Sequence, residues 1–196
     1  MLSSMPRVSI QAQDFNLADE IARLRSGDKR VGAVCSFIGT VRDRNIAPTP
    51  ATLCAALPPE GAELAKGGPS LRSLACDAVL SMELEHYPGM TEKAIEAMID
   101  EAAARFDIFA ARVVHRIGLL QPLDQVVMVA VTSAHRGESF RACEFLMDYL
   151  KTQAPFWKKE MTPDGARWVD ARVSDDVAMA RWGLDAALVN HAATVK

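Results

Sequence analysis

Two lysines on either side of a proline are the residues of this 196-residue sequence whose types and spacing most clearly suggest chemistry. Lys151 is expected in the last turn of a helix, and Lys158 follows the break that Pro155 imposes on that helix. The break lets the chain turn and bring both ammonium groups over one pocket, for which Phe156 and Trp157 would provide an apolar wall. Two ammonium groups at a dry pocket favour an anion between them. In the alternative interpretation, Lys151 complements the helix dipole and the aromatic pair belongs to the core.

Two further polar segments follow expected strands. Residues 132–136 separate an apolar strand from a helix, whose N-terminal N–H groups suit a phosphate. Within this segment Arg136 adds further donors, and His135 can donate or shuttle a proton. Residues 39–45 follow another strand and include Arg42. Both segments can instead be a helix cap and a polar loop with solvated charges. Neither offers a nucleophile with an obvious partner, so together they predict a site for an anionic small molecule without naming its reaction.

The elements that must position these residues follow from hydrophobic periodicity. Strands and helices mix without strict alternation, which predicts an α+β fold. Helices are expected after the caps Asn16 and Thr91, after Gly137, and over residues 175–184. Strands are expected over residues 8–11, 31–38, 76–85, 111–117, 125–132, 158–161 and 167–171.

Burial within these elements can also be predicted. The run at 31–38 is mostly apolar and partly β-branched, which is typical of a buried strand. Apolar and polar residues alternate in 76–85, so Leu80, Met82 and Leu84 should face the core together. In the helix after Gly137, Phe140 and Cys143 share an apolar stripe.

Residues 46–70 differ in composition from the rest of the chain. They contain five of the ten prolines, with three glycines and several alanines. Because proline disfavours helices and interior strands, this composition predicts a mobile loop or insertion and not a second domain. We therefore expect residues 1–196 to form a single domain with this insertion and a C-terminal extension after about residue 182.

Composition and charge exclude several classes of function. The net charge of −3 and the pI of about 5.8 argue against a general nucleic-acid binder. No apolar run is long enough to cross a membrane, and the N-terminus lacks the apolar region of a signal peptide, so we expect a cytoplasmic protein. The four cysteines and four histidines are scattered, so we expect neither a disulfide framework nor a metal site.

Several motifs resemble, in order and spacing, the large catalytic subunit of molybdopterin synthase. They are LEHYPGMTEK at 84–93, HRIG at 115–118, TSAHR at 132–136, MDYLKT at 147–152 and APFWK at 154–158. The resemblance implies a fold of α/β-hammerhead type with a mixed, largely antiparallel sheet. It implies the conversion of cyclic pyranopterin monophosphate to molybdopterin, with sulfur supplied by the thiocarboxylated C-terminal glycine of a small ubiquitin-like subunit. It also implies a homodimer of large subunits with one small subunit at each end, and no cofactor.

The resemblance implies roles for individual residues. Lys151 and Lys158 match the family's catalytic lysines, and we expect Lys151 to orient the thiocarboxylate and stabilise charge during sulfur transfer. The substrate-binding positions implied are Thr40, Val41, Arg42, His135, Arg136, Lys151, Lys158, Lys159, Glu160 and Arg172. Arg172 is expected to reach the site across the dimer interface. The sequence departs from the family pattern at Thr40, Leu119, Leu123, Asp124 and Gln153.

Two other functions remain open on the residues alone. One is a sulfurtransferase that carries a persulfide on its own cysteine, which cysteine labelling during turnover would reveal. The other is a non-catalytic module that binds a pterin or a phosphate. The presence of both Lys151 and Lys158 argues against the second.

Overall fold

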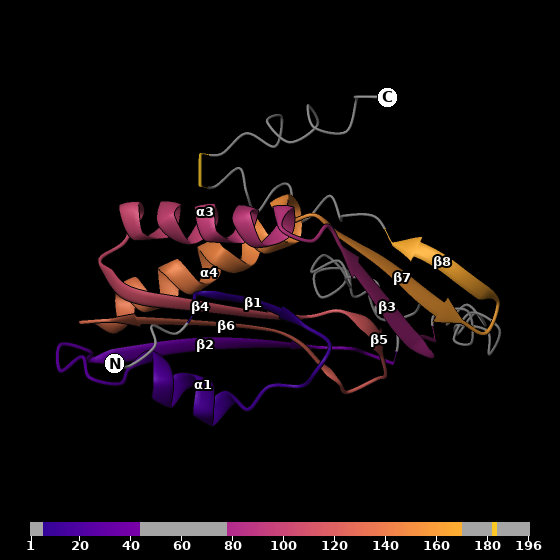
Figure 1. Ribbon diagram of the computed structural model, residues 1–196, viewed down its shortest axis with the longest axis horizontal. Coiled ribbons are helices and arrows are strands. Elements are labelled where there is room, and N and C mark those ends of the chain that lie inside the picture. Colours follow the sequence, from indigo (N-terminus) through magenta and orange to yellow (C-terminus); the bar gives the residue numbers. More distant parts are fainter. Residues whose placement is uncertain (1–5, 44–77, 170–181, 184–196) are drawn as a thin grey trace, which may run out of the picture.

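The computed structural model describes residues 6–43, 78–169 and 182–183 of the chain (Figure 1). Within these residues, two four-stranded sheets combine with three helices, so the predicted α+β class is confirmed. The expected loop at 46–70, Arg172, nearly all of the expected helix at 175–184 and the C-terminal extension lie outside the described residues.

The strands form two sheets that lie beside each other (Figure 1). The first sheet has the order β1-β4-β6-β2, in which only the β1–β4 pair is parallel. Its strands are β1 (Val8–Gln11), β2 (Ala33–Thr40), β4 (Ile108–Arg116) and β6 (Gln125–Ser133). The second sheet is antiparallel throughout, in the order β5-β3-β7-β8. Its strands are β3 (Ser81–His86), β5 (Gly118–Leu120), β7 (Phe156–Thr162) and β8 (Gly165–Val169).

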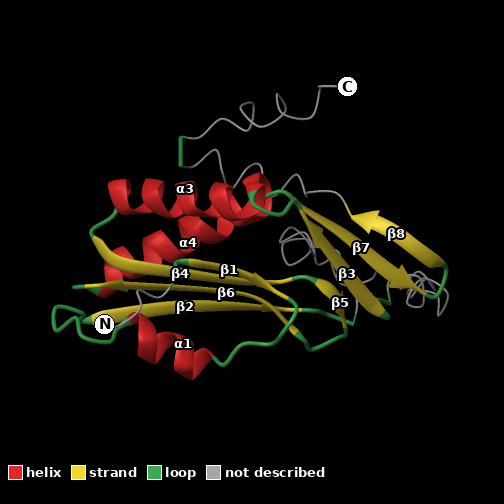
Figure 2. Ribbon diagram, in the orientation of Figure 1, coloured by secondary structure: helices red, strands yellow, loops and turns green. Residues whose placement is uncertain are grey.

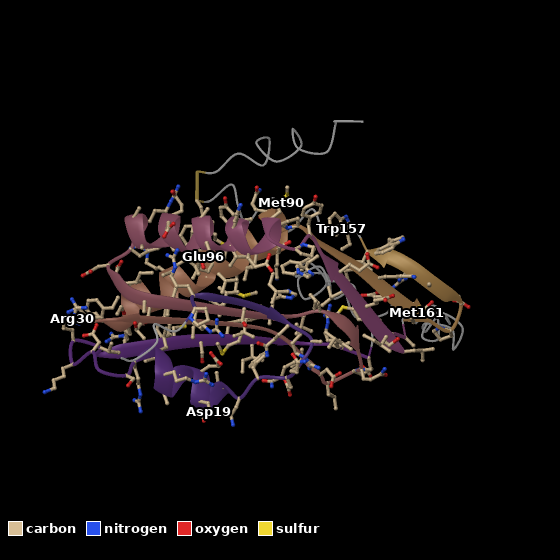
Figure 3. The ribbon with its side chains drawn as sticks, in the orientation of Figure 1. Asp19, Arg30, Met90, Glu96, Trp157 and Met161 are labelled. Carbon is tan, nitrogen blue, oxygen red and sulfur yellow. The ribbon has the colours of Figure 1, made fainter. Side chains whose placement is uncertain are left out.

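The helices cover both faces of the first sheet (Figure 2). α3 (Met90–Arg105) and α4 (Arg136–Gln153) pack on one face, and α1 (Leu17–Leu24) packs on the other. Asp19 on α1 and Glu96 on α3 accordingly lie on opposite sides of the first sheet (Figure 3). The main core fills the space between α3, α4 and the sheet, and its fully buried side chains include Ile95, Met98, Val113, Val129, Phe145 and Leu146. None of the helices in the described residues is long and apolar enough to cross a membrane.

The start of α3 is fixed by Gly89 and Thr91. Gly89 is the N-cap, with a φ of +79° that favours glycine, and its N–H donates to the Glu92 carboxylate at 2.6 Å. Thr91, expected as the cap, instead lies in the first turn and is fully buried. Its hydroxyl lies 3.0 Å from the carbonyl oxygen of Tyr87 and 3.2 Å from that of Pro155, so both oxygens can share its proton. This contact ties the start of α3 to the segment that ends α4.

Three predictions about burial are wrong, each for a geometric reason. β2, expected to be buried, is an edge strand of the first sheet, and Phe37 is 41% exposed. Leu80 is 56% exposed because β3 begins only at Ser81, so the alternation does not extend to it. Phe140 is 58% exposed because α4 packs the face that contains Cys143, and Phe140 lies beside that face.

A buried ion pair joins α1 to the first sheet. Arg112 Nε donates to Glu20 Oε2 at 2.8 Å, and the two side chains are only 6% and 9% exposed. Arg112 also donates through Nη1 to the carbonyl oxygen of Pro6 at 2.8 Å. The exposed Arg23 also contacts Glu20, with Nη2 3.3 Å from Oε1, so removing Arg112 would leave the buried carboxylate with this weaker partner alone among the described residues.

Candidate active site

A pocket of about 480 Å³ opens where the C-terminal ends of β2 and α4 meet the second sheet. We call it the lysine pocket because Lys151, from α4, and Lys158, from β7, both line it. Thr40 and Arg42 line it at the end of β2. Most of its other lining side chains are apolar, and they include Phe37, Met82, Leu84, Met147, Leu150 and Phe156.

The two lysines converge because the chain breaks between them as the sequence predicts. α4 ends at Gln153, and Ala154 already has extended backbone angles, which Pro155 favours in the residue before it. β7 then begins at Phe156, which stands on the same face of the strand as Lys158. Phe156 therefore contributes to the apolar wall of the pocket.

Trp157 does not contribute to that wall, contrary to expectation. It is 49% exposed and points away from the pocket, because successive residues of a strand alternate between its faces. Trp157 and Met161 lie toward opposite ends of β7 (Figure 3). Lys159, also expected to bind substrate, is on this outer face as well, where its ammonium lies 5.5 Å from the centre of the Trp168 ring and 3.9 Å from a Glu83 oxygen.

The lysine pocket is cationic. Arg42, Lys151 and Lys158 line it, whereas no acidic side chain of the described residues does. Within the described part of the chain, neither Arg42 nor Lys151 makes an ion pair or a side-chain hydrogen bond. Their charges are therefore available to a ligand, and cations on apolar walls attract an anion more strongly than cations in bulk water.

The end of β2 is held so that Arg42 reaches the pocket. Val41, expected among the substrate-binding residues, is 3% exposed and packs in a cluster with Met82, Leu84 and Leu120. Its N–H donates to the Asp124 carbonyl oxygen at 2.9 Å. Val41 thus fixes the backbone, while its neighbours Thr40 and Arg42 line the pocket.

His135 and Arg136 lie at the other end of α4 from the lysines (Figure 1). His135 is the N-cap of this 18-residue helix, and Arg136 is its first residue. Because the helix rises 1.5 Å per residue, the α-carbons of Arg136 and Lys151 are about 22 Å apart. One chain therefore does not bring this pair of residues to its own lysine pocket.

Glu160 is buried beside the pocket and does not line it. Its Oε1 lies 2.8 Å from Lys158 Nζ, and its Oε2 lies 3.2 Å from Arg167 Nη2. A carboxylate that is 2% exposed and contacts two cations can hold Lys158 in one position. This geometry suits a positioning residue better than a ligand of an anionic substrate.

We expect Glu160→Gln to lower turnover about tenfold while the protein stays folded. The amide preserves the shape of the side chain but removes the charge that orients Lys158, and a charge-assisted hydrogen bond is about twice as strong as a neutral one. Steady-state kinetics and thermal melting measure the two effects. Glu83→Gln is the matched control, because Glu83 pairs with Lys159 on the outer face of the same sheet. Equal losses in both variants would contradict a specific role for Glu160.

His115 lines the lysine pocket and was not singled out from the sequence as a site residue. Its ring stacks on Phe156 with 3.9 Å between ring centres and 17° between ring planes. Burial, and to a smaller extent the nearby His86, lowers the pKa of His115 to about 4. The sequence signals for it are its inward position in the alternating strand at 111–117 and its place at the start of the HRIG motif, and neither assigns it to a site.

The cysteines of the described residues lie outside the lysine pocket. Cys143 is buried on α4, next to Cys35 on β2. Burial, and secondarily Cys35, raises the pKa of the Cys143 thiol to about 12. Within the described residues, no group of three or more His, Cys, Asp and Glu side chains is placed to hold a metal ion.

Known proteins resemble this chain in sequence and in structure. The chain is 52% identical to a molybdopterin synthase catalytic subunit from Ralstonia nicotianae, over 92% of this chain and 86% of that one. It is 42% identical to the molybdopterin synthase catalytic subunit of Escherichia coli, over 90% of this chain and 97% of that one. The chain belongs to this family.

Other comparisons with the molybdopterin synthase catalytic subunit family agree. The family described as MoaE protein matches residues 71–153, which include Lys151. A solved molybdopterin biosynthesis MoaE protein from Burkholderia ambifaria is 48% identical, with a TM-score of 0.67 over 92% of this chain and all of that one. A molybdopterin synthase structure from Staphylococcus aureus, 27% identical, gives a TM-score of 0.62 over 85% of this chain and 98% of that one.

Proposed function

We propose that this protein is the catalytic subunit of a molybdopterin synthase. It transfers sulfur from the thiocarboxylated C-terminus of a small ubiquitin-like subunit to cyclic pyranopterin monophosphate. The cationic lysine pocket carries this proposal, since the substrate bears a phosphate and the donor tail ends in an anion. The apolar walls of the pocket suit the remainder of a small organic ligand.

Each cation of the pocket has a role in this proposal. Lys151, which has no partner among the described residues, orients the thiocarboxylate and stabilises the charge that develops as sulfur is transferred. Lys158, held by Glu160, and Arg42 bind the phosphate and the pterin. The sulfur comes from the partner subunit, so the pocket needs no nucleophile of its own.

The direct test is turnover of cyclic pyranopterin monophosphate with a thiocarboxylated small subunit. The same assay excludes a persulfide on this chain when all four cysteines are replaced, as Cys35→Ala, Cys143→Ala, Cys54→Ser and Cys76→Ser. We expect the cysteine-free protein to keep at least half of the wild-type turnover, because in this proposal the sulfur comes from the partner subunit and neither Cys35 nor Cys143 lines the lysine pocket. Cys143, with a pKa of about 12, also forms little thiolate at neutral pH. Loss of turnover in a folded cysteine-free protein would favour the persulfide reaction.

We infer further that His135 and Arg136 bind the substrate of a second copy in a homodimer. The α-carbon of Arg136 lies about 22 Å from that of Lys151 in the same chain, measured along α4 at 1.5 Å per residue. Arg172, which lies outside the described residues, is proposed to reach the pocket across the same interface. Each pocket then needs residues from two chains.

Mixed dimers test this arrangement. We expect a dimer of one Lys151→Ala copy and one Arg136→Ala copy to show about half of the wild-type activity, because one of its pockets receives both intact residues. Differently tagged copies allow this dimer to be purified, and the two homodimeric variants are the controls. If Arg136 served the pocket of its own chain, both pockets would be defective and the mixed dimer would be no more active than those controls.

A further inference from the structure

The tautomer of His115 follows from its hydrogen bond. His115 Nδ1 lies 2.8 Å from the carbonyl oxygen of Arg116. A carbonyl oxygen only accepts hydrogen bonds, so Nδ1 carries the proton. With a pKa lowered to about 4 by burial, the ring is neutral near pH 7, and Nε2 therefore holds a lone pair.

That lone pair faces the lysine pocket. Among the described residues, every side-chain nitrogen or oxygen that is fully enclosed by the protein has a hydrogen-bond partner. His115 Nε2 has no hydrogen-bond partner among these residues. Nε2 must therefore retain some accessible surface. Because His115 lines the lysine pocket and is otherwise buried, this surface is in the pocket.

The pocket otherwise offers few acceptors. Its lysine and arginine side chains are donors only, and the hydroxyl of Thr40 is the other lining side-chain oxygen or nitrogen of the described residues that can accept. The thioether sulfurs of Met82 and Met147 are only weak acceptors. Phe156, on which His115 stacks, is two residues from Lys158 on the same face of β7, which corresponds to roughly 7 Å along the strand. A ligand of pterin size can therefore contact the acceptor with one part and the cations with another.

We propose that His115 Nε2 accepts a hydrogen bond from a ring N–H group of the substrate, and that it selects ligands that combine such a donor with an anionic group. This inference rests on the proposed function, because it takes a pterin phosphate as the ligand. His115 is a substrate-binding residue in this proposal and not a proton carrier, since its ring stays neutral throughout.

Three variants of His115 separate the acceptor from the rest of the ring. His115→Phe keeps a ring that can stack on Phe156 and removes both nitrogens. His115→Asn can place an amide N–H near the Nδ1 position for the Arg116 carbonyl but loses the acceptor at the Nε2 position. His115→Gln can place its amide oxygen near the Nε2 position. Isothermal titration of each variant uses two probes without the small subunit, cyclic pyranopterin monophosphate and inorganic phosphate, and thermal melting reports the fold.

We expect His115→Phe and His115→Asn to bind the cyclic pyranopterin about tenfold more weakly than the wild type, a typical effect of one lost hydrogen bond. His115→Gln should stay within about threefold, and all three should bind inorganic phosphate within about twofold of the wild type. Equal weakening toward both probes, or unchanged pterin affinity in His115→Asn, would overturn the assignment. Wild-type protein that fails to bind the cyclic pyranopterin would instead refute the proposed function itself, and this inference with it.

Discussion

Replacing Lys151 with alanine is expected to lower turnover by about 10²–10³-fold, the usual effect of removing one group that stabilises charge in a transition state. The side chain is exposed at the end of α4 and has no partner among the described residues. Its removal should therefore cost little stability beyond its interaction with the helix dipole, which is worth about 0.3–1 kcal/mol. Turnover with the thiocarboxylated small subunit, measured beside the melting temperature, separates these effects.

The matched control for this variant is Lys93→Ala. Lys93 is an exposed lysine on α3 that does not line the lysine pocket, so its loss removes the same charge from the surface. We expect Lys93→Ala to keep wild-type turnover, and both variants to bind the small subunit. A folded Lys151→Ala protein that transfers sulfur at a near-normal rate would refute the role of Lys151.

Arg112→Ala is expected to destabilise the protein by about 3 kcal/mol, because it removes the buried cation that contacts Glu20 Oε2 and leaves this carboxylate only the exposed Arg23, 3.3 Å from its other oxygen. Both side chains of this pair are less than 10% exposed, so water cannot replace the lost contact easily. Urea denaturation measures the change in the free energy of unfolding.

Two further variants test this explanation. Arg141→Ala breaks an ion pair with Glu138 whose arginine is 63% exposed, and it should cost less than about 1 kcal/mol. The double variant Arg112→Met with Glu20→Leu replaces both buried charges with apolar side chains, and we expect it to be more stable than Arg112→Ala. A double variant as unstable as Arg112→Ala would show that packing at this position, and not the loss of the buried ion pair, determines the loss of stability.

Local features of the fold could be predicted because their causes are local. Asn16 was expected to cap α1, and its side-chain oxygen accepts from the N–H of Ala18 at 2.9 Å. The turn at residues 162–165 was expected from its proline, aspartate and glycine, and it joins β7 to β8 with Gly165 at a φ of +120°. The break at Pro155 likewise placed Lys151 and Lys158 at one pocket.

Features that depend on the packing of distant segments could not be predicted. Within the described residues β2 pairs only with β6, which places it at a sheet edge. Its apolar composition therefore wrongly indicated burial. Glu160 is acidic in a cationic segment, and only the fold shows that it is buried between Lys158 and Arg167. His115 could be placed on an alternating strand from the sequence. Its place in the pocket, where its ring stacks on Phe156, could not, because Phe156 lies 41 residues further along the chain.

The length of α4 has a consequence for how the protein responds to salt. At physiological ionic strength the Debye length is about 8 Å, far shorter than the roughly 22 Å between the α-carbons of Arg136 and Lys151. Both side chains are exposed, so ions screen the field of one before it reaches the other. Within one chain, the two ends of the helix therefore attract anions independently. A change in pocket affinity after substitution of Arg136 accordingly reports direct contact with the ligand, and not a weakened long-range potential.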